Sequence, residues 1–69
     1  MFGEGVREIR IIEAYYNDKL VGKFVDMHTL RNQLGALADK VSVKFNTINE
    51  KTHNTLFWTI IRNGYEKVK

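Results

Sequence analysis

The side chains best suited to metal or acid–base chemistry are the two histidines, His28 and His53. They lie far apart in the sequence, without the His-x-x-x-His spacing that places two imidazoles on one face of a helix. A zinc site draws most of its ligands from Cys and His, and the chain has no cysteine to supply thiolates. The sequence therefore predicts neither a metal site nor a cofactor.

Nucleophilic and carboxylate chemistry find no better support. Ser42 is the only serine, and its neighbours are not those of the Gly-x-Ser-x-Gly turn that presents a catalytic serine. Glu8 and Glu13 fall on opposite faces of an expected strand, so they cannot act as a pair. We therefore predict that the protein is not an enzyme. A small basic ribonuclease is the catalytic alternative, with its acid, base and charge drawn from His53, Arg62, Tyr65 and Lys67.

The charge distribution points to binding instead. The 69-residue chain has a net charge of +3, and residues 40–69 hold six lysines and arginines against two acids, whereas residues 1–26 hold four against five. Such asymmetry is typical of proteins with an anionic partner, although a soluble surface also needs net charge. The charge distribution therefore predicts binding through the C-terminal half of the chain.

The clearest periodic signal predicts an amphipathic helix from Met27 to about Asp39. Asp26 precedes it as a plausible N-cap, and Gly35 would let the helix approach its support closely. The stripe that faces the core repeats at helical spacing and consists of Met27, Leu30, Leu34, Leu37 and Val41.

Strand signals flank this helix. Two runs rich in β-branched and aromatic residues, 8–16 and 20–25, are separated by Asn17-Asp18-Lys19 and predict a β-hairpin, although the first run would also fit a helix. After the helix, Val41 to Phe45 alternates strictly, as a strand does. Residues 49–54 are polar and predict a turn.

The segment from Thr55 to Arg62 is apolar on both alternating faces, and we expect it to be a strand. The same residues also fit the stripe of a helix beginning at Asn54. Asn63-Gly64 predicts a turn or a helix C-cap.

These elements predict a single α+β domain spanning residues 1–69, with residues 1–5 frayed. The element order is β-β-α-β-β, an antiparallel sheet with one helix on one face. The chain has no cysteine, no signal-like run and no apolar stretch long enough to cross a membrane, so we expect a cytoplasmic protein.

The bare face of this sheet is where we expect function. The first hypothesis is a nucleic-acid-binding module in which lysines and arginines neutralise phosphate and aromatic rings stack on bases. With Val43 and Phe45 turned to the helix, Ser42, Lys44 and Asn46 would line the bare face, joined by Arg10 and Lys23. The residues expected to bind are Lys44, Lys51, Trp58, Arg62, Tyr65, Lys67 and Lys69.

The alternative is a regulator or inhibitor that binds another protein, or an obligate homodimer. An uncovered apolar strand on a small domain is typical of an interface. In this version the interface would use strand 55–62, with Phe57, Trp58, Ile60 and Ile61 as contacts.

Overall fold

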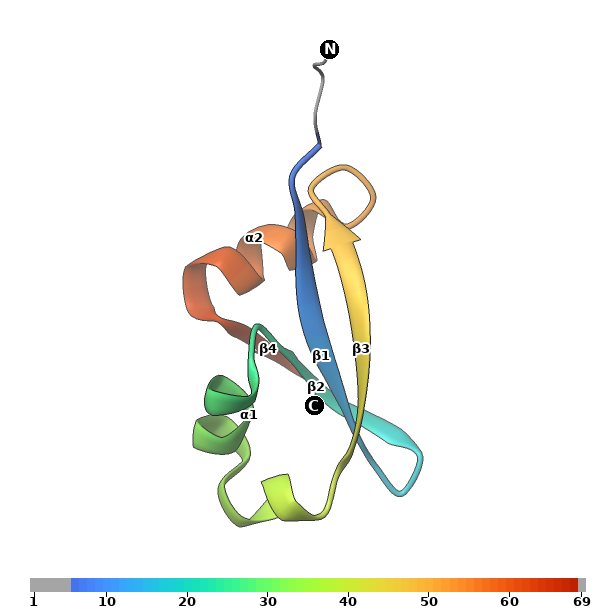
Figure 1. The fold of residues 1–69 in the computed structure, drawn as a ribbon, viewed down its shortest axis with the longest axis vertical. Helices are drawn as coiled ribbons and strands as arrows, with labels where there is room; N and C mark the ends of the chain where they lie inside the picture. The colour runs from blue at the N-terminus through green and yellow to red at the C-terminus, as the bar shows by residue number, and fades with distance from the viewer. Residues whose placement is uncertain (1–5, 69) are drawn as a thin grey trace.

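Four antiparallel strands form one sheet in the computed structural model, which describes residues 6–68 (Figure 1). The strand order is β3-β1-β2-β4. The strands are β1 (Glu8–Tyr16), β2 (Lys19–Phe24), β3 (Ser42–Asn49) and β4 (Tyr65–Lys67). The helices are α1 (Met27–Leu34), the 3-10 helix η1 (Gly35–Asp39) and α2 (Asn54–Asn63). The predicted α+β class with a four-stranded antiparallel sheet is confirmed. The predicted fraying of residues 1–5 and the predicted site residue Lys69 lie outside the described residues.

The first hairpin forms as predicted. Asn17 and Asp18 both have positive φ angles, 52° and 64°, as the central residues of a tight type I′ hairpin turn require. The two strands pair antiparallel from Ile12 opposite Phe24 to Tyr16 opposite Lys19, with an irregularity between Ala14 and Tyr15. The Asn-Asp pair therefore sets where the chain reverses.

The predicted central helix is present but divided. The Asp26 carboxylate accepts a hydrogen bond from the Thr29 N–H at 2.8 Å and caps α1 as expected. α1 then ends at Leu34, because Gly35 has φ 60° and ψ −129°, which α-helical residues do not adopt. Nothing lies within 4 Å of a Cβ built on Gly35. The expected reason for this glycine, close packing of the helix, is therefore wrong, and its backbone conformation is the reason.

Residues 55–62 are helical, so the expected strand there is wrong and the alternative of a helix from Asn54 is confirmed. In α2 the side chains of Leu56, Phe57 and Ile60 are buried on one face, whereas Ile61 is half exposed. The helix ends at Gly64, whose φ of 84° is left-handed, as a C-cap favours. As a strand, this segment would have had an apolar side chain on each face. As a helix, it gathers most of these side chains on one side.

The remaining strands differ in length from the prediction. β3 begins at Ser42, one residue into the predicted alternating run, and continues to Asn49, and the polar turn follows it. The fourth strand is the short β4, which pairs with β2 through Phe24 opposite Tyr65. The element order is therefore β-β-α-β-α-β. Among residues 6–68, no helix combines the length and the apolar character needed to cross a membrane.

In the described residues, each face of the sheet carries one α-helix, at opposite ends of β1. We call the side of Ile9, Ile11 and Glu13 the α2 face, because Ile11 packs with Ile48 of β3 and with α2. The side of Arg10, Ile12 and Ala14 is the α1 face, because Ile12 and Ala14 pack with Phe24 and Leu30. Figure 1 shows α2 beside the upper half of the sheet and α1 beside the lower half. A single helix would have left one face of the sheet bare along its whole length. Here each face is covered over part of its length instead.

Candidate binding surface

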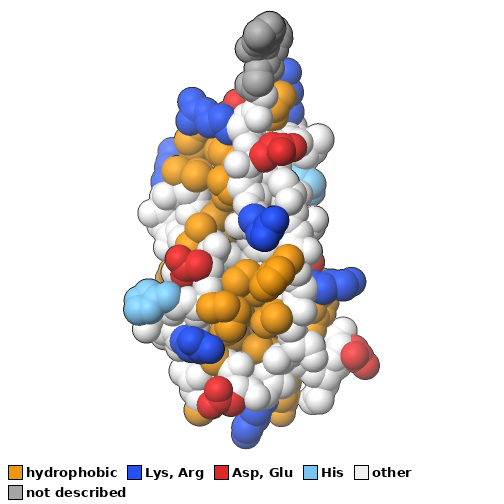
Figure 2. Space-filling model, viewed as in Figure 1, with side chains coloured by type: hydrophobic (Ala, Val, Ile, Leu, Met, Phe, Trp, Pro, Cys, Tyr) orange, Lys and Arg blue, Asp and Glu red, His pale blue; other side chains and the backbone are white. Residues whose placement is uncertain are grey.

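The predicted basic residues lie on several separate parts of the fold. Lys44 is on β3, Lys51 is in the turn before α2, Arg62 is near the end of α2, and Lys67 ends β4. All four are exposed. Figure 2 shows lysine and arginine side chains set apart from one another and mixed with acidic ones on the face that it presents. On that face the basic residues therefore do not form one continuous stripe.

The two predicted stacking rings lie on opposite sides of the sheet. Trp58 is half buried on α2, edge-to-face with Phe57 at 5.1 Å between ring centroids, and the Arg7 guanidinium lies 5.4 Å from the Trp58 ring centroid. Tyr65 is half buried on the α1 face, stacked on Phe24 at 6.4 Å. The fold gives both rings packing partners inside the protein and does not bring them together.

Half of the residues named for a protein interface are in the core. Phe57 and Ile60 are each 1% exposed, because α2 turns them toward Ile11 and Ile48. Ile61 is 50% exposed and Trp58 only partly so. An interface along residues 55–62 thus retains Ile61 and the partly exposed Trp58.

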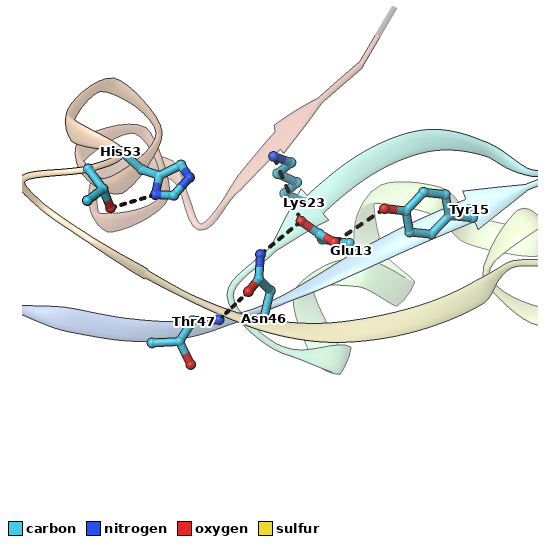
Figure 3. A network of polar contacts seen from close by, with 7 residues as sticks. Glu13, Tyr15, Lys23, Asn46, Thr47 and His53 are labelled. Carbon is cyan, nitrogen blue, oxygen red and sulfur yellow. Dashed lines mark hydrogen bonds and ion pairs between the residues drawn. The ribbon is translucent and has the colours of Figure 1, made fainter.

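A polar network occupies the part of the α2 face beyond the end of α2 (Figure 3). Glu13 is at its centre: its carboxylate accepts hydrogen bonds from the Tyr15 hydroxyl at 3.3 Å and from Asn46 Nδ2 at 3.4 Å, and it lies 3.9 Å from Lys23 Nζ. Lys44 Nζ lies 6.0 Å from the centroid of the Tyr15 ring. The members of this network satisfy one another across three strands.

The network also changes the chemistry of Tyr15. Partial desolvation raises the pKa of its hydroxyl above the ordinary value, and the neighbouring Glu13 carboxylate, by its charge and its hydrogen bond, raises that pKa further. A raised pKa makes the tyrosine a weaker acid, so it does not favour a role as a proton donor near neutral pH.

The histidines do not join this network. His28 Nε2 lies 3.2 Å from Asn32 Nδ2 on α1, and His53 Nδ1 lies 2.9 Å from the Thr52 hydroxyl before α2. Within residues 6–68, no group of three or more His, Cys, Asp or Glu side chains is placed to hold a metal ion.

The outer edge of β3 is the largest unpaired stretch of backbone in the described sheet. Among the described residues, β3 is eight residues long and pairs only with β1 (Figure 1), whereas the other edge strand, β4, has three. The Glu50 N–H donates to the Arg7 carbonyl at 3.1 Å, so Arg7 and Glu50 are a hydrogen-bonded pair at the end of the β1–β3 ladder. From Glu8 opposite Asn49, the register continues without a break.

This register fixes which backbone groups point outward. Because hydrogen-bonded pairs alternate along an antiparallel ladder, the N–H and C=O groups of Val43, Phe45 and Thr47 point away from β1. The Thr47 N–H donates instead to its neighbour, Asn46 Oδ1, at 2.9 Å. The outward N–H and C=O groups of Val43 and Phe45 are therefore the ones most available to hydrogen-bond with a further strand.

Apolar side chains accompany this edge. Phe45 is 62% exposed and Val43 is 42% exposed, both on the α1 face but beyond the reach of α1. Figure 2 shows hydrophobic side chains gathered on the lower half of the face presented there. Arg10, on the same face, lines a shallow hollow with Phe45, Asn46 and Thr47. We call Val43, Phe45 and Thr47, with their outward backbone, the β3 edge.

The expectation that Val43 and Phe45 pack under the helix is wrong. The set of residues expected together on the bare face is also partly wrong. Lys23 does share a face with Lys44, Asn46 and Ser42, but Arg10 lies on the opposite side. The alternation of β3 was visible in the sequence. Its position at the edge of the sheet was not, and that position leaves Phe45 exposed.

Comparison with protein-family models, with curated proteins and with solved structures found no match for this chain. The candidate site therefore rests on the geometry of the chain itself.

Proposed function

We propose that the protein is a non-enzymatic regulatory module that binds another protein by accepting one of its strands along the β3 edge. The observation that carries this proposal is Phe45, a phenylalanine 62% exposed on an eight-residue strand whose outer side pairs with no strand within residues 6–68. Large apolar side chains left exposed beside open backbone are typical of sites that bind an extended segment.

The recognition would combine backbone and side-chain contacts. The backbone groups of Val43 and Phe45 would hydrogen-bond to the incoming strand, which supplies affinity for any extended sequence. Side chains at alternate positions of that strand would pack beside Val43 and Phe45, which supplies preference for apolar residues there.

A displayed library of random peptides, selected on the whole protein, tests the proposal. We expect extended peptides with alternating apolar residues to be enriched, and the amides of Val43 and Phe45 to gain protection from hydrogen exchange when such a peptide binds. Phe45→Lys should abolish that binding. Ile61→Lys is the matched control, because Ile61 is similarly exposed but lies on α2. Enriched peptides that bind Phe45→Lys as well as the wild type would refute the proposal.

Single-stranded nucleic acid is the second candidate partner, and Arg10 beside Phe45 favours it. An exposed ring next to a guanidinium can stack on a base while the charge meets phosphate. Lys51, in the turn after β3, would extend the contact, whereas Lys44 lies on the other face of the strand. Such binding weakens steeply with salt because neutralised phosphates release counterions.

A binding assay with single-stranded RNA and with single- and double-stranded DNA, at low and moderate salt, tests this candidate. Arg10→Glu should reduce retention more than Arg62→Glu, because Arg62 lies on α2, away from Phe45. No retention at low salt would exclude it.

For either partner, the cysteine-free composition supports our inference that the protein works in the reducing cytoplasm.

A further inference from the structure

We propose that the strand accepted by the β3 edge is β3 of a second copy of this chain, paired antiparallel about a two-fold axis at Phe45. This inference names the partner for the function proposed above and rests on it. The resulting sheet would run β4-β2-β1-β3-β3-β1-β2-β4 through the two copies. Its only free edges would be the three-residue β4 strands.

The positions of the outward backbone groups allow this pairing. In a two-fold antiparallel pair centred on Phe45, Phe45 lies opposite its own copy, and Val43 lies opposite Thr47. All three residues direct their backbone groups outward, so both strands can exchange hydrogen bonds in register. The Thr47 N–H would leave Asn46 Oδ1 for the Val43 carbonyl of the second copy, while Asn46 Nδ2 keeps its bond to Glu13.

The side chains favour the same register. On the α1 face, the two Phe45 rings, exposed in the single chain, would cover one another. On the α2 face, each Lys44 would lie opposite Asn46 of the other copy. Moving the axis to Lys44 would instead place two lysines directly opposite one another, and like charges there destabilise a pair. Moving it to Asn46 would separate the aromatic rings.

The other elements make β3 the matching partner. β4 is too short to pair along an eight-residue strand, so β3 does not find an equal partner on the opposite edge of another copy. A symmetric β3–β3 pair also closes on itself, whereas β3–β4 contacts would repeat without end. A domain of this size without disulfides would also gain stability from association.

Sedimentation of the wild-type chain over a range of concentrations is the first test. We expect a monomer–dimer equilibrium, and we expect Phe45→Lys to weaken the dimer at least about tenfold, as loss of a central aromatic contact does. Ile61→Lys should leave the equilibrium unchanged. Circular dichroism would verify that both variants fold. A wild-type chain that stays monomeric at high concentration overturns the dimer.

Disulfide trapping tests the register, because the chain has no cysteine of its own. Hydrogen-bonded antiparallel partners have Cα atoms about 5.5 Å apart, which a disulfide can span. We expect an equal mixture of Val43→Cys and Thr47→Cys chains to form the mixed disulfide dimer, while neither variant cross-links efficiently alone. Cross-linking of Lys44→Cys with itself, or none in the mixture, would overturn the proposed register.

The peptide selection described above separates the two proposals. If the chain stays monomeric but still binds extended peptides at β3, the dimer is refuted and docking of a foreign strand stands. If neither peptides nor a second copy protects Val43 and Phe45 from exchange, both proposals fail.

Discussion

Ile12 and Phe45 are directly opposite one another across the β1–β3 ladder, yet Ile12 is 6% exposed and Phe45 is 62% exposed. Both side chains lie on the α1 face. α1 packs over β1 and β2, where Leu30 meets Ile12 and Phe24, and does not extend over β3. The boundary of the core therefore runs between two neighbouring strands, and Phe45 falls outside it.

This boundary predicts unequal effects of removing two phenylalanines. Phe57→Ala should cost about 3–5 kcal/mol of the free energy of unfolding, because Phe57 is 1% exposed and its loss leaves a cavity. Phe45→Ala should cost less than about 1 kcal/mol in the monomer, as exposed substitutions do. Urea denaturation at a concentration low enough to keep the chain monomeric would measure both. Equal losses would show that Phe45 is packed in the folded protein.

Gly22 should tolerate no side chain while Phe24 keeps its place. A Cβ at Gly22 would lie 2.7 Å from Cζ of Phe24, whose ring is fully buried against Tyr65, and 3.2 Å from the Glu66 carbonyl oxygen. We expect Gly22→Ala to cost about 1–3 kcal/mol, as overpacking does. In a double-mutant cycle, the cost should shrink in a Phe24→Leu background. A cost that is the same in both backgrounds would locate the strain elsewhere.

The cap of α1 should make stability depend on pH in the acid range. The hydrogen bond from the Thr29 N–H holds the pKa of the Asp26 carboxyl below its ordinary value. A depressed pKa in the folded state means that the contribution is full above the unfolded value, about 3.9, and is lost as pH falls through the folded value.

Thermal unfolding across that acid range would check this dependence. Asp26→Asn keeps an acceptor for the Thr29 N–H but does not titrate, so its melting temperature should fall less steeply than that of the wild type as pH is lowered. Asp26→Ala should be less stable than both at neutral pH. Parallel acid profiles for wild type and Asp26→Asn would argue against the cap as the cause.

Glu13 should control part of the acidity of Tyr15. Glu13→Gln removes the charge near the hydroxyl, so the Tyr15 pKa should fall toward its ordinary value, while the desolvation that raises it remains. Because the folded-state pKa is raised, the related stability is present below the unfolded value and is lost as pH rises through the folded one.

Nuclear magnetic resonance titration of the Tyr15 ring would measure that change. Glu8→Gln is the control, since Glu8 lies on the other face near the start of β1 and should leave the Tyr15 titration unaltered. A Tyr15 pKa that does not move in Glu13→Gln would mean that desolvation alone raises it.

Local signals in the sequence predicted the elements that local physics controls. Asn17 and Asp18 accept positive φ angles at little cost, so the hairpin turn was readable without knowing its surroundings. Asp26 caps α1 through a bond to a residue three positions away. Gly64 ends α2 for the same kind of reason, because its backbone is left-handed.

The segment after the polar turn was misassigned because its local preference and its final structure disagree. Its threonines, isoleucines and aromatic rings favour a strand, but packing of Leu56, Phe57 and Ile60 on Ile11 and Ile48 favours a helix. Intrinsic propensities differ by less than about 1 kcal/mol per residue, so burial of several large side chains outweighs them.

The sequence by itself determined the types of the candidate side chains, the hairpin turn, the helix caps and the alternation of β3. Only the tertiary structure decided that β3 lies at the edge of the sheet, that Phe45 is left uncovered, and that the basic residues are dispersed. Those outcomes depend on strand order and on where each helix crosses the sheet. Both are set by the sum of many long-range contacts. A periodic pattern within one segment does not determine these contacts.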